Sequence, residues 1–306
     1  MAIIDNPKSP LVGKLEGVHL FHFDGAPCAQ RVRFALVERG LARGREVPWQ
    51  SARPEHCKAP SGTWASRHVS LIKKDHITPA YAAIQPNMVV PALVHDGVLH
   101  IESMDIVKYV DDNWPGEKLI PEDPERLTLS DSLVQQGKAL HRSVRYVSFR
   151  WGLGSLGKLR AKEEAQLRQL ENKNSPEAML EFYSGFDSGR IPESVYLDHL
   201  QALEAGYANL NQLLEDGRQY LTGDTLTPAD ILWSLKVLRI SECGYPFARN
   251  YPALNEWFAR VRERPGFREG VMGKHRIMSA AFKAKAAVEN FCGVGIKQVS
   301  CSAKAA

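Results

Sequence analysis

The sequence predicts two domains, an α/β domain at the N-terminal end and an all-α domain after it. Short apolar runs alternate with turn residues over the first part of the chain, which is typical of strands and helices in succession. Beyond residue 124 the apolar residues instead recur at three- and four-residue spacing, which is the period of a helix. With 306 residues, of which 44% are hydrophobic and 24% charged, the chain is long enough to bury both cores.

Composition divides the chain further. We expect an N-terminal extension, an α/β domain, a linker, a helical domain and a C-terminal tail, at residues 1–16, 17–114, 115–124, 125–272 and 273–306. The linker is rich in proline, glycine and charged residues, as inter-domain connections are. The tail holds six lysines and arginines and one glutamate, a net charge of +5, whereas the whole chain carries +4. Because the positive charge is confined to the tail, we expect a solvated, mobile end there and no nucleic-acid binding.

The composition indicates neither a membrane protein nor a metal site. No apolar run approaches the roughly 18 residues of a membrane span, and the N-terminus lacks a basic region followed by an apolar stretch. We therefore expect a cytoplasmic protein without membrane contact. The five cysteines are odd in number and show no Cys-x-x-Cys spacing, so neither a disulfide framework nor a zinc site is expected.

The first predicted strand covers residues 18–23, and a Gly- and Pro-containing turn leads from it into a helix that runs from Cys28 to Gly40. Cys28 therefore lies in the first helical turn. Unpaired backbone N–H groups and the charge of Arg31 favour a thiolate at that place. Two interpretations stay open, because Cys28 is either a reactive nucleophile or a small packing residue.

A second strand is predicted at residues 45–49. The stretch from there to residue 84 is long for a connection, and we expect two short helices in it, at 63–74 and 78–84.

A β-hairpin is predicted at residues 88–101, where two apolar runs flank an Asp-Gly turn. Val90-Pro91 opens its first strand, and because proline lacks a backbone N–H, the strand begins here or lies at an edge. If the Val90–Pro91 peptide bond is cis, the N–H and C=O of Val90 face outward and are free for an extended peptide ligand.

Glu102 and Ser103 stand where the hairpin gives way to the next helix. Ser103 is the predicted N-cap. The helix N-terminus offers N–H groups to a carboxylate, and Glu102 beside it can accept hydrogen bonds from an ammonium group. A carboxylate and an ammonium group on one carbon describe the end of an α-amino acid. The alternative is an ordinary Ser-capped helix.

Val90-Pro91 followed eleven residues later by Glu102-Ser103 resembles the glutathione site of the cytosolic glutathione S-transferases. The resemblance implies a thioredoxin-like N-terminal domain, in which Val90, next to Pro91, pairs with the cysteinyl backbone of glutathione by strand addition. It also implies that Glu102 and Ser103 hold the γ-glutamyl end. Gln85 occupies the place where many relatives carry Asn before this loop, and the resemblance places it with Val90, Pro91, Glu102 and Ser103 among the glutathione-binding residues.

The turn before the first helix indicates which branch of this family the chain resembles. A Gly-x-Pro-Cys turn followed by Arg31-Val32-Arg33 is similar to the zeta-type, reductive dehalogenase and bacterial β-etherase branch. The activating group in this turn is a serine or a cysteine in such relatives, and Cys28 stands at the cysteine position. Ala26 and Pro27 occupy the places where a hydroxyl is expected, so activation of glutathione by a hydroxyl is in doubt.

The helical domain begins with one long helix, whose apolar stripe runs from Leu133 to Trp151. The resemblance implies that this helix lines the pocket for the second substrate. A mixture of aromatic and cationic groups would suit a small aromatic substrate, although core packing and exposed arginines explain the same residues equally well. The candidates are Arg145, Tyr146, Phe149 and Trp151.

A charged helix is predicted at 159–174, within a 158–187 insertion of a kind that also occurs in the dehalogenase and β-etherase relatives. Another helix is predicted at 192–214. Thr227, with Pro228 next and Asp230 three residues on, forms a predicted capping box before a helix that is apolar nearly all round.

The resemblance covers about residues 17–272 and implies a glutathione-dependent transferase or lyase. The thiolate of glutathione would attack a hydrophobic, aromatic electrophile, in β-aryl ether cleavage of the kind used on lignin aromatics or in dehalogenation. An alternative is a non-catalytic or supporting subunit of a heterodimer with the same fold. The resemblance further implies a two-fold dimer, with an identical or a different partner chain.

Overall fold

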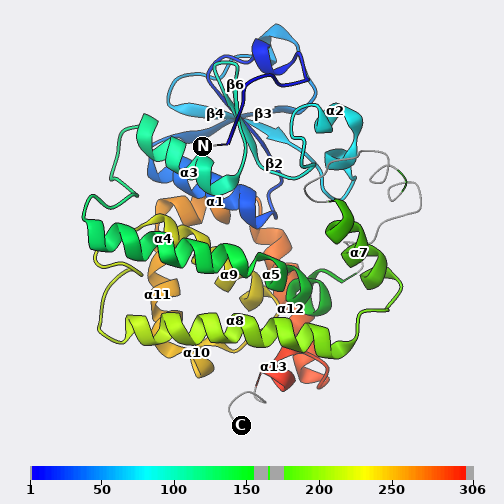
Figure 1. The fold of residues 1–306 in the computed structure, drawn as a ribbon, viewed down its shortest axis with the longest axis vertical. Coiled ribbons are helices and arrows are strands. Elements are labelled where there is room, and N and C mark those ends of the chain that lie inside the picture. The colour runs from blue at the N-terminus through cyan, green and yellow to red at the C-terminus, as the bar shows by residue number, and fades with distance from the viewer. Residues whose placement is uncertain (1, 155–164, 166–175, 301–306) are drawn as a thin grey trace. The chain divides into compact units, whose positions relative to one another are not determined.

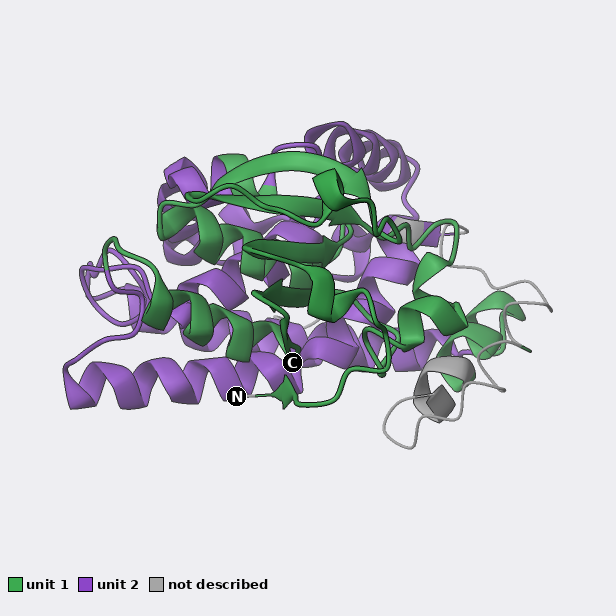
Figure 2. Ribbon diagram, turned by 90° about the horizontal axis from the view of Figure 1, so that it is seen from above, with its two compact units in different colours: residues 1–117, 157–190, 269–271 green, residues 118–156, 191–268, 272–306 purple. Residues whose placement is uncertain are grey.

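The computed structural model describes residues 2–154, 165 and 176–300 (Figure 1). The chain divides into two compact units, coloured separately in Figure 2. Unit 1 comprises Met1–Glu117, Gly157–Arg190 and Glu269–Val271, and unit 2 comprises Lys118–Leu156, Ile191–Arg268 and Met272–Ala306. Most of the helix predicted at 159–174 lies outside the described residues.

Unit 1 is built on one six-stranded sheet with the strand order β1-β6-β5-β2-β4-β3. Strands β2, β4 and β3 run parallel, whereas β5 is antiparallel to both β2 and β6. The strands are β1 (Ile3–Ile4), β2 (Val18–His22), β3 (Ala42–Pro48), β4 (Thr63–His68), β5 (Ala92–His95) and β6 (Val98–His100). The predicted hairpin is confirmed as β5–β6, and the positive φ values at its turn, 47° at Asp96 and 79° at Gly97, are those that a tight hairpin requires.

Helices accompany this sheet, so the predicted α/β class of the N-terminal part is confirmed. Helix α1 packs against α3, which follows the hairpin. The helices of unit 1 are α1 (Pro27–Glu38), α2 (Pro79–Ala82), α3 (Ser103–Asn113) and α7 (Pro176–Asp187), with 3-10 turns η1 (Val12–Lys14), η2 (Pro54–His56) and η3 (Asp75–Ile77). Gly40 ends α1 as predicted, with a φ of 79° that favours glycine.

The helix predicted at 63–74 is wrong, because its first half is strand β4. This strand pairs with β2 on one side and with β3 on the other. Four consecutive side chains, Trp64 to Arg67, are buried. A strand covered on both faces shows no alternation of polar and apolar residues, so the period that identifies a surface strand is missing here.

Arg67 of β4 stabilises the segment between β3 and β4 by hydrogen bonds. Its side chain is fully buried, and Nε donates to Nδ1 of His19 at 3.1 Å. Nη1 donates to the carbonyl oxygens of Trp49 at 3.1 Å and Ser51 at 3.0 Å, and Nη2 donates to that of His56 at 2.5 Å. Nη1 also donates to the carbonyl oxygen of Pro48 at 3.5 Å. One guanidinium thus holds four backbone carbonyls, at the end of β3 and in the segment that follows it.

Unit 2 is all-α, as predicted. Its helices are α4 (Pro124–Ala139), α5 (His141–Ser148), α8 (Glu193–Leu214), α9 (Pro228–Glu242), α10 (Phe247–Asn250), α11 (Pro252–Glu263), α12 (Arg276–Phe291) and α13 (Ile296–Val299), with π-helical segments η4 (Phe149–Leu153) and η6 (Gly266–Val271), the latter shared with unit 1. Helix α9 is buried along most of its length. The predicted capping box between Thr227 and Asp230 is present, and the Asp230 carboxylate also accepts from Trp257 Nε1 at 2.8 Å.

Two predictions for unit 2 are wrong. The long helix expected up to Trp151 is two helices, α4 and α5, because Leu140 leaves the helical region with ψ of 8°. The tail expected to be mobile contains α12, which packs on α9 and buries Ser279, Phe282 and Ala286. Only one of these three is a large apolar side chain, so the helical period in the tail sequence is weak.

No helix in the described part of the chain has the length and apolar character needed to cross a membrane.

Candidate functional site

The candidate site lies at the N-terminal ends of α1 and α3, both in unit 1. Helix α1 has Ala26 at its N-cap and no side-chain cap, so its first backbone N–H groups are not satisfied by a capping side chain. Cys28 is half-buried in this first turn, as predicted. Helix α3 begins at Ser103, one residue earlier than expected, with Glu102 at the N-cap and again no side-chain cap. Two helix ends with partial positive charge therefore belong to one site.

Arg31 joins these two helix ends. Its Nη1 donates to Ser103 Oγ at 3.2 Å and lies 3.6 Å from Cys28 Sγ. The side chain is only 5% exposed, and its Nε has no hydrogen-bond partner among the described residues. Within those residues no carboxylate forms an ion pair with it. Since a buried cation without a counterion is costly, this arrangement favours an anion at the site.

The sequence indicated Arg31 only as a charge near Cys28, and its contact with Ser103 was missed. The two residues are 72 positions apart, so no local pattern connects them.

The loop before β5 leaves the backbone of Val90 free. The Val90–Pro91 peptide bond is cis, and Val90 makes no backbone hydrogen bond within the described residues. Gln85 is fully buried, donates to the Pro91 carbonyl at 3.2 Å and accepts from the Asn87 backbone N–H at 3.0 Å. Gln85 thus fixes the shape of the loop, while the N–H and C=O of Val90 remain for another partner.

Glu102 presents its carboxylate to solvent beside this loop. Its backbone has φ of 64° and ψ of 107°, a conformation that non-glycine residues rarely adopt and that is concentrated at ligand sites. The Asn87 side chain donates to Oε1 at 3.4 Å, which leaves Oε2 for an ammonium group. Asn87 was not singled out in the sequence.

The predicted second-substrate residues lie in α5 and η4 of unit 2. Tyr146 and Trp151 are buried, with ring centroids 6.0 and 6.4 Å from that of Tyr196 on α8. Phe149 is also buried, and Arg145 is half-buried. The structure therefore places Tyr146 and Trp151 beside the same ring, that of Tyr196, in unit 2, and the role of the four candidates toward a substrate stays a prediction.

The sequence matches two family models, the glutathione S-transferase N-terminal domain over residues 20–118 and the C-terminal domain over residues 174–265. The chain belongs to the glutathione S-transferase family. The predicted resemblance is confirmed, and members of this family bind glutathione as a co-substrate. Glutathione S-transferase Z2 of Arabidopsis thaliana is 23% identical over 259 residues, 83% of this chain and 91% of that protein. Glutathione S-transferase 1 of Dianthus caryophyllus is 27% identical over 113 residues, which span 37% of this chain and only 42% of that transferase.

Solved structures of the family share the fold. The β-etherase LigF from Sphingobium sp. strain SYK-6 has a TM-score of 0.67 at 20% identity, covering 83% of this chain and 98% of its own. Human glutathione-S-transferase T1-1 has a TM-score of 0.60 at 17% identity, covering 91% of this chain and 100% of its own. At such identities the likeness shows the common fold.

Proposed function

We propose that this chain is a glutathione-dependent transferase or lyase that acts on a hydrophobic, aromatic electrophile. The observation that carries the proposal is Arg31, a buried guanidinium without an acidic partner among the described residues, in contact with both Cys28 and Ser103. A single cation thereby reaches both the position proposed for the γ-glutamyl end and that proposed for the thiol of glutathione.

The chain offers complementary groups for the γ-glutamyl and cysteinyl parts of the tripeptide. Ser103 and the N–H groups of α3 suit the γ-glutamyl carboxylate, and the free carboxylate oxygen of Glu102 suits the ammonium group. The N–H and C=O of Val90 can pair with the peptide backbone as an added strand.

Arg31 and the N-terminal N–H groups of α1 favour an ionised sulfur near Cys28, because they place positive charge where the thiolate forms. Bound glutathione supplies the sulfur nucleophile. In the substitution a carbon–sulfur bond forms while the bond from that carbon to an aryloxide or a halide breaks, and the leaving group departs with the electron pair. The fold shared with a protein described as a β-etherase supports a β-aryl ether as the first electrophile to assay.

Replacing Glu102 tests the binding half of the proposal. We expect Glu102→Ala to weaken binding to immobilised glutathione by roughly 10-fold or more, because an ion-assisted hydrogen bond is lost. Glu16→Ala is the matched control, since Glu16 is an exposed glutamate of the same unit whose carboxylate lies 3.1 Å from Lys58. Failure of the wild-type chain to bind at millimolar glutathione, with Glu102→Ala behaving identically, would contradict the proposal.

The role of Cys28 decides whether the site catalyses thiol transfer or ether cleavage. A nucleophilic Cys28 would form a mixed disulfide with glutathione and support thiol transfer, which requires a second thiol for its resolution. The other described cysteines are Cys57 and Cys243, both buried, and Cys292, which is exposed in unit 2. We therefore expect Cys28→Ser to keep ether cleavage within a few-fold of wild type, since Arg31 and the helix end remain.

The measurement is ether turnover by Cys28→Ser beside the alkylation rate of Cys28, with exposed Cys292 as the internal reference. Loss of turnover together with rapid alkylation of Cys28 would make it the nucleophile.

A supporting subunit is the second candidate function, favoured by Ala26 and Pro27 in the turn where relatives carry a hydroxyl. Such a subunit would bind glutathione and contribute little chemistry within a two-fold dimer. Turnover by the purified chain alone, compared with the chain mixed with related partners, separates the two proposals.

A further inference from the structure

Helix α12 has one buried side and one exposed apolar side. Its buried residues, Ser279, Phe282 and Ala286, lie where the helix packs on α9. On the other side, exposed apolar residues recur at alternating spacings of four and three, which keeps them on one face of a helix. They form the outer face of α12, which consists of Ile277, Ala281, Ala284, Val288 and Phe291.

This outer face gathers a large share of the exposed apolar side chains of the described chain. Ile277 is 85% exposed and Phe291 92%, and Val288 is exposed as well. With Val294, just beyond the helix, they make up four of the eight large hydrophobic side chains that are exposed among the described residues. Single exposed apolar residues need no explanation, but such a cluster marks an interaction surface.

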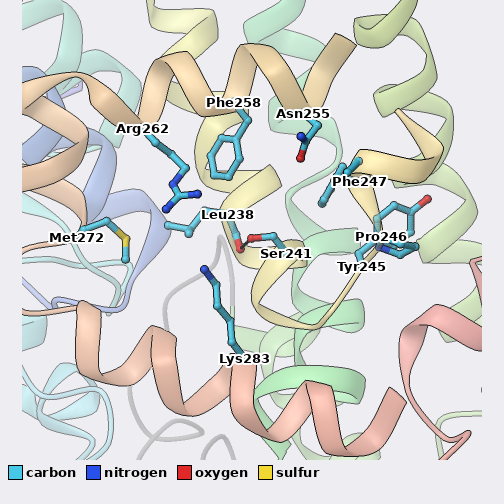
Figure 3. A pocket seen from close by; sticks show the side chains of 11 residues that line it. Leu238, Ser241, Tyr245, Pro246, Phe247, Asn255, Phe258, Arg262, Met272 and Lys283 are labelled. Carbon is cyan, nitrogen blue, oxygen red and sulfur yellow. Dashed lines mark hydrogen bonds between the residues drawn. The ribbon is translucent and has the colours of Figure 1, made fainter. Parts of the chain in front are cut away.

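Cations lie on both borders of the outer face. Arg276 and Lys283 are exposed and share one border, because they are two helical turns apart, and Lys285 lies on the other. Figure 3 shows Lys283 extending from α12 on the side of α9 and α11, which is the border and not the centre of the outer face. The sequence of α12 contains one acidic residue, Glu289, and Lys285 Nζ donates to it at 2.7 Å. The border of Arg276 and Lys283 therefore keeps its positive charge.

We propose that the outer face of α12 docks on an anionic lipid surface, with the helix lying in the plane of the interface. The apolar side chains enter the boundary between headgroups and acyl chains, and the long cationic side chains at the borders turn toward the negative headgroups. With 16 residues, α12 is about 24 Å long and lies on a bilayer without crossing it. This inference revises the expectation, based on composition, that the protein has no membrane contact.

A second copy of the chain matches the outer face less well. A two-fold interface brings the same patch of both copies together, so Arg276 and Lys283 of one copy would lie beside those of the other. Like charges so placed repel each other. A surface that contains phosphatidylserine is instead negative, so it attracts every cation on the borders.

A groove on another protein also matches the outer face less well. Grooves that bind an amphipathic helix take anchoring side chains from consecutive turns. The large residues Ile277 and Val288 are three turns apart, and the outer face has only Ala281 and Ala284 between them. A lipid interface needs no such spacing, because binding there depends on total apolar area and on charge.

Flotation of the full-length chain with unilamellar vesicles tests the proposal. We expect the chain to float with phosphatidylcholine vesicles that contain about 30% phosphatidylserine and to remain unbound with pure phosphatidylcholine, because only the first surface is negative. Raising the sodium chloride concentration from about 0.05 M to about 0.5 M should release the bound chain, because salt screens the headgroup charge.

Variants of the outer face and its borders assign the binding to α12. Ile277→Ser and Phe291→Ser should each weaken binding to the mixed vesicles roughly 10-fold, because an apolar side chain is lost from the interface. Ile72→Ser is the matched control, since Ile72 is an exposed isoleucine of unit 1. Arg276→Gln should weaken binding roughly 5-fold, and Arg53→Gln, at an exposed arginine of unit 1, should bind as the wild type does.

All the replaced side chains are exposed, so the variants should fold as the wild type does. Equal binding to the two kinds of vesicle, or binding by Ile277→Ser and Phe291→Ser that matches the wild type, would overturn the proposal. Absence of binding to either vesicle would also overturn it and would leave the outer face to a protein partner. A smaller mass of Phe291→Ser than of the wild type in sedimentation velocity, without vesicle binding, would assign this face to a second copy.

Discussion

Replacing Arg31 with methionine is expected to remove glutathione binding while leaving the folded chain at least as stable as the wild type. The guanidinium is buried, its Nε is unpartnered among the described residues, and its Nη1 contacts Cys28 Sγ and Ser103 Oγ, neither of them a carboxylate. Exchanging a buried charge for an apolar side chain of similar length is often neutral or stabilising. Loss of the charge opposite a desolvated anion costs about 2–5 kcal/mol, so binding should fall by roughly 30-fold or more.

Calorimetric titration with glutathione measures the affinity of the variant. Urea unfolding measures its stability. Arg31→Lys is the informative companion variant, because it keeps the charge but lacks the planar fork that reaches both partners, and it should recover only part of the affinity. Unchanged affinity in Arg31→Met would show that the anion binds elsewhere. A large loss of stability would instead make Arg31 a structural residue.

The parts of the fold that the sequence predicts well are those whose signals are local. The Asp-Gly hairpin, the Gly40 helix end and the Thr227–Asp230 capping box each lie within a few residues of chain, and each is present. Strand β4 and helix α12 were mispredicted for the opposite reason. Their identity is decided by what covers them, on both faces of β4 and along the narrow buried stripe of α12.

The candidate site shows the same limit. Glu102 and Ser103 could be singled out because a strand end and a helix start are adjacent in the sequence. The contact of Arg31 with Ser103 and that of Asn87 with Glu102 depend on the tertiary fold, which brings residues 72 and 15 positions apart together. Charge at a helix start was therefore predictable, whereas the lack of a counterion for Arg31 among the described residues was not.

Replacement by methionine at Arg67, unlike at Arg31, should destabilise the fold strongly. Arg67→Met would leave the carbonyls of Trp49, Ser51 and His56 and the Nδ1 atom of His19 without their donor in a buried place. Each unsatisfied buried acceptor costs about 1–3 kcal/mol, so the free energy of unfolding should fall by roughly 4 kcal/mol or more in urea titrations. Arg45→Met is the matched control on the neighbouring strand, because Arg45 is exposed and, among the described residues, contacts only Nε2 of His56.

The free energy of unfolding, measured as the pH is lowered, gives an independent test of the role of Arg67. Burial, and then the charge of Arg67, lower the pKa of His19 to about 4 from its usual 6.5. Between these two values the unfolded chain binds more protons at this residue than the folded chain, so its contribution to stability is complete above pH 6.5 and falls as the pH drops toward 4. In Arg67→Met the Arg67 charge is gone and Nδ1 of His19 is free to take a proton. The loss of stability with falling pH should therefore be shallower in Arg67→Met than in Arg45→Met. A small loss of stability in Arg67→Met with an unchanged pH profile would mean that the segment between β3 and β4 does not depend on this guanidinium.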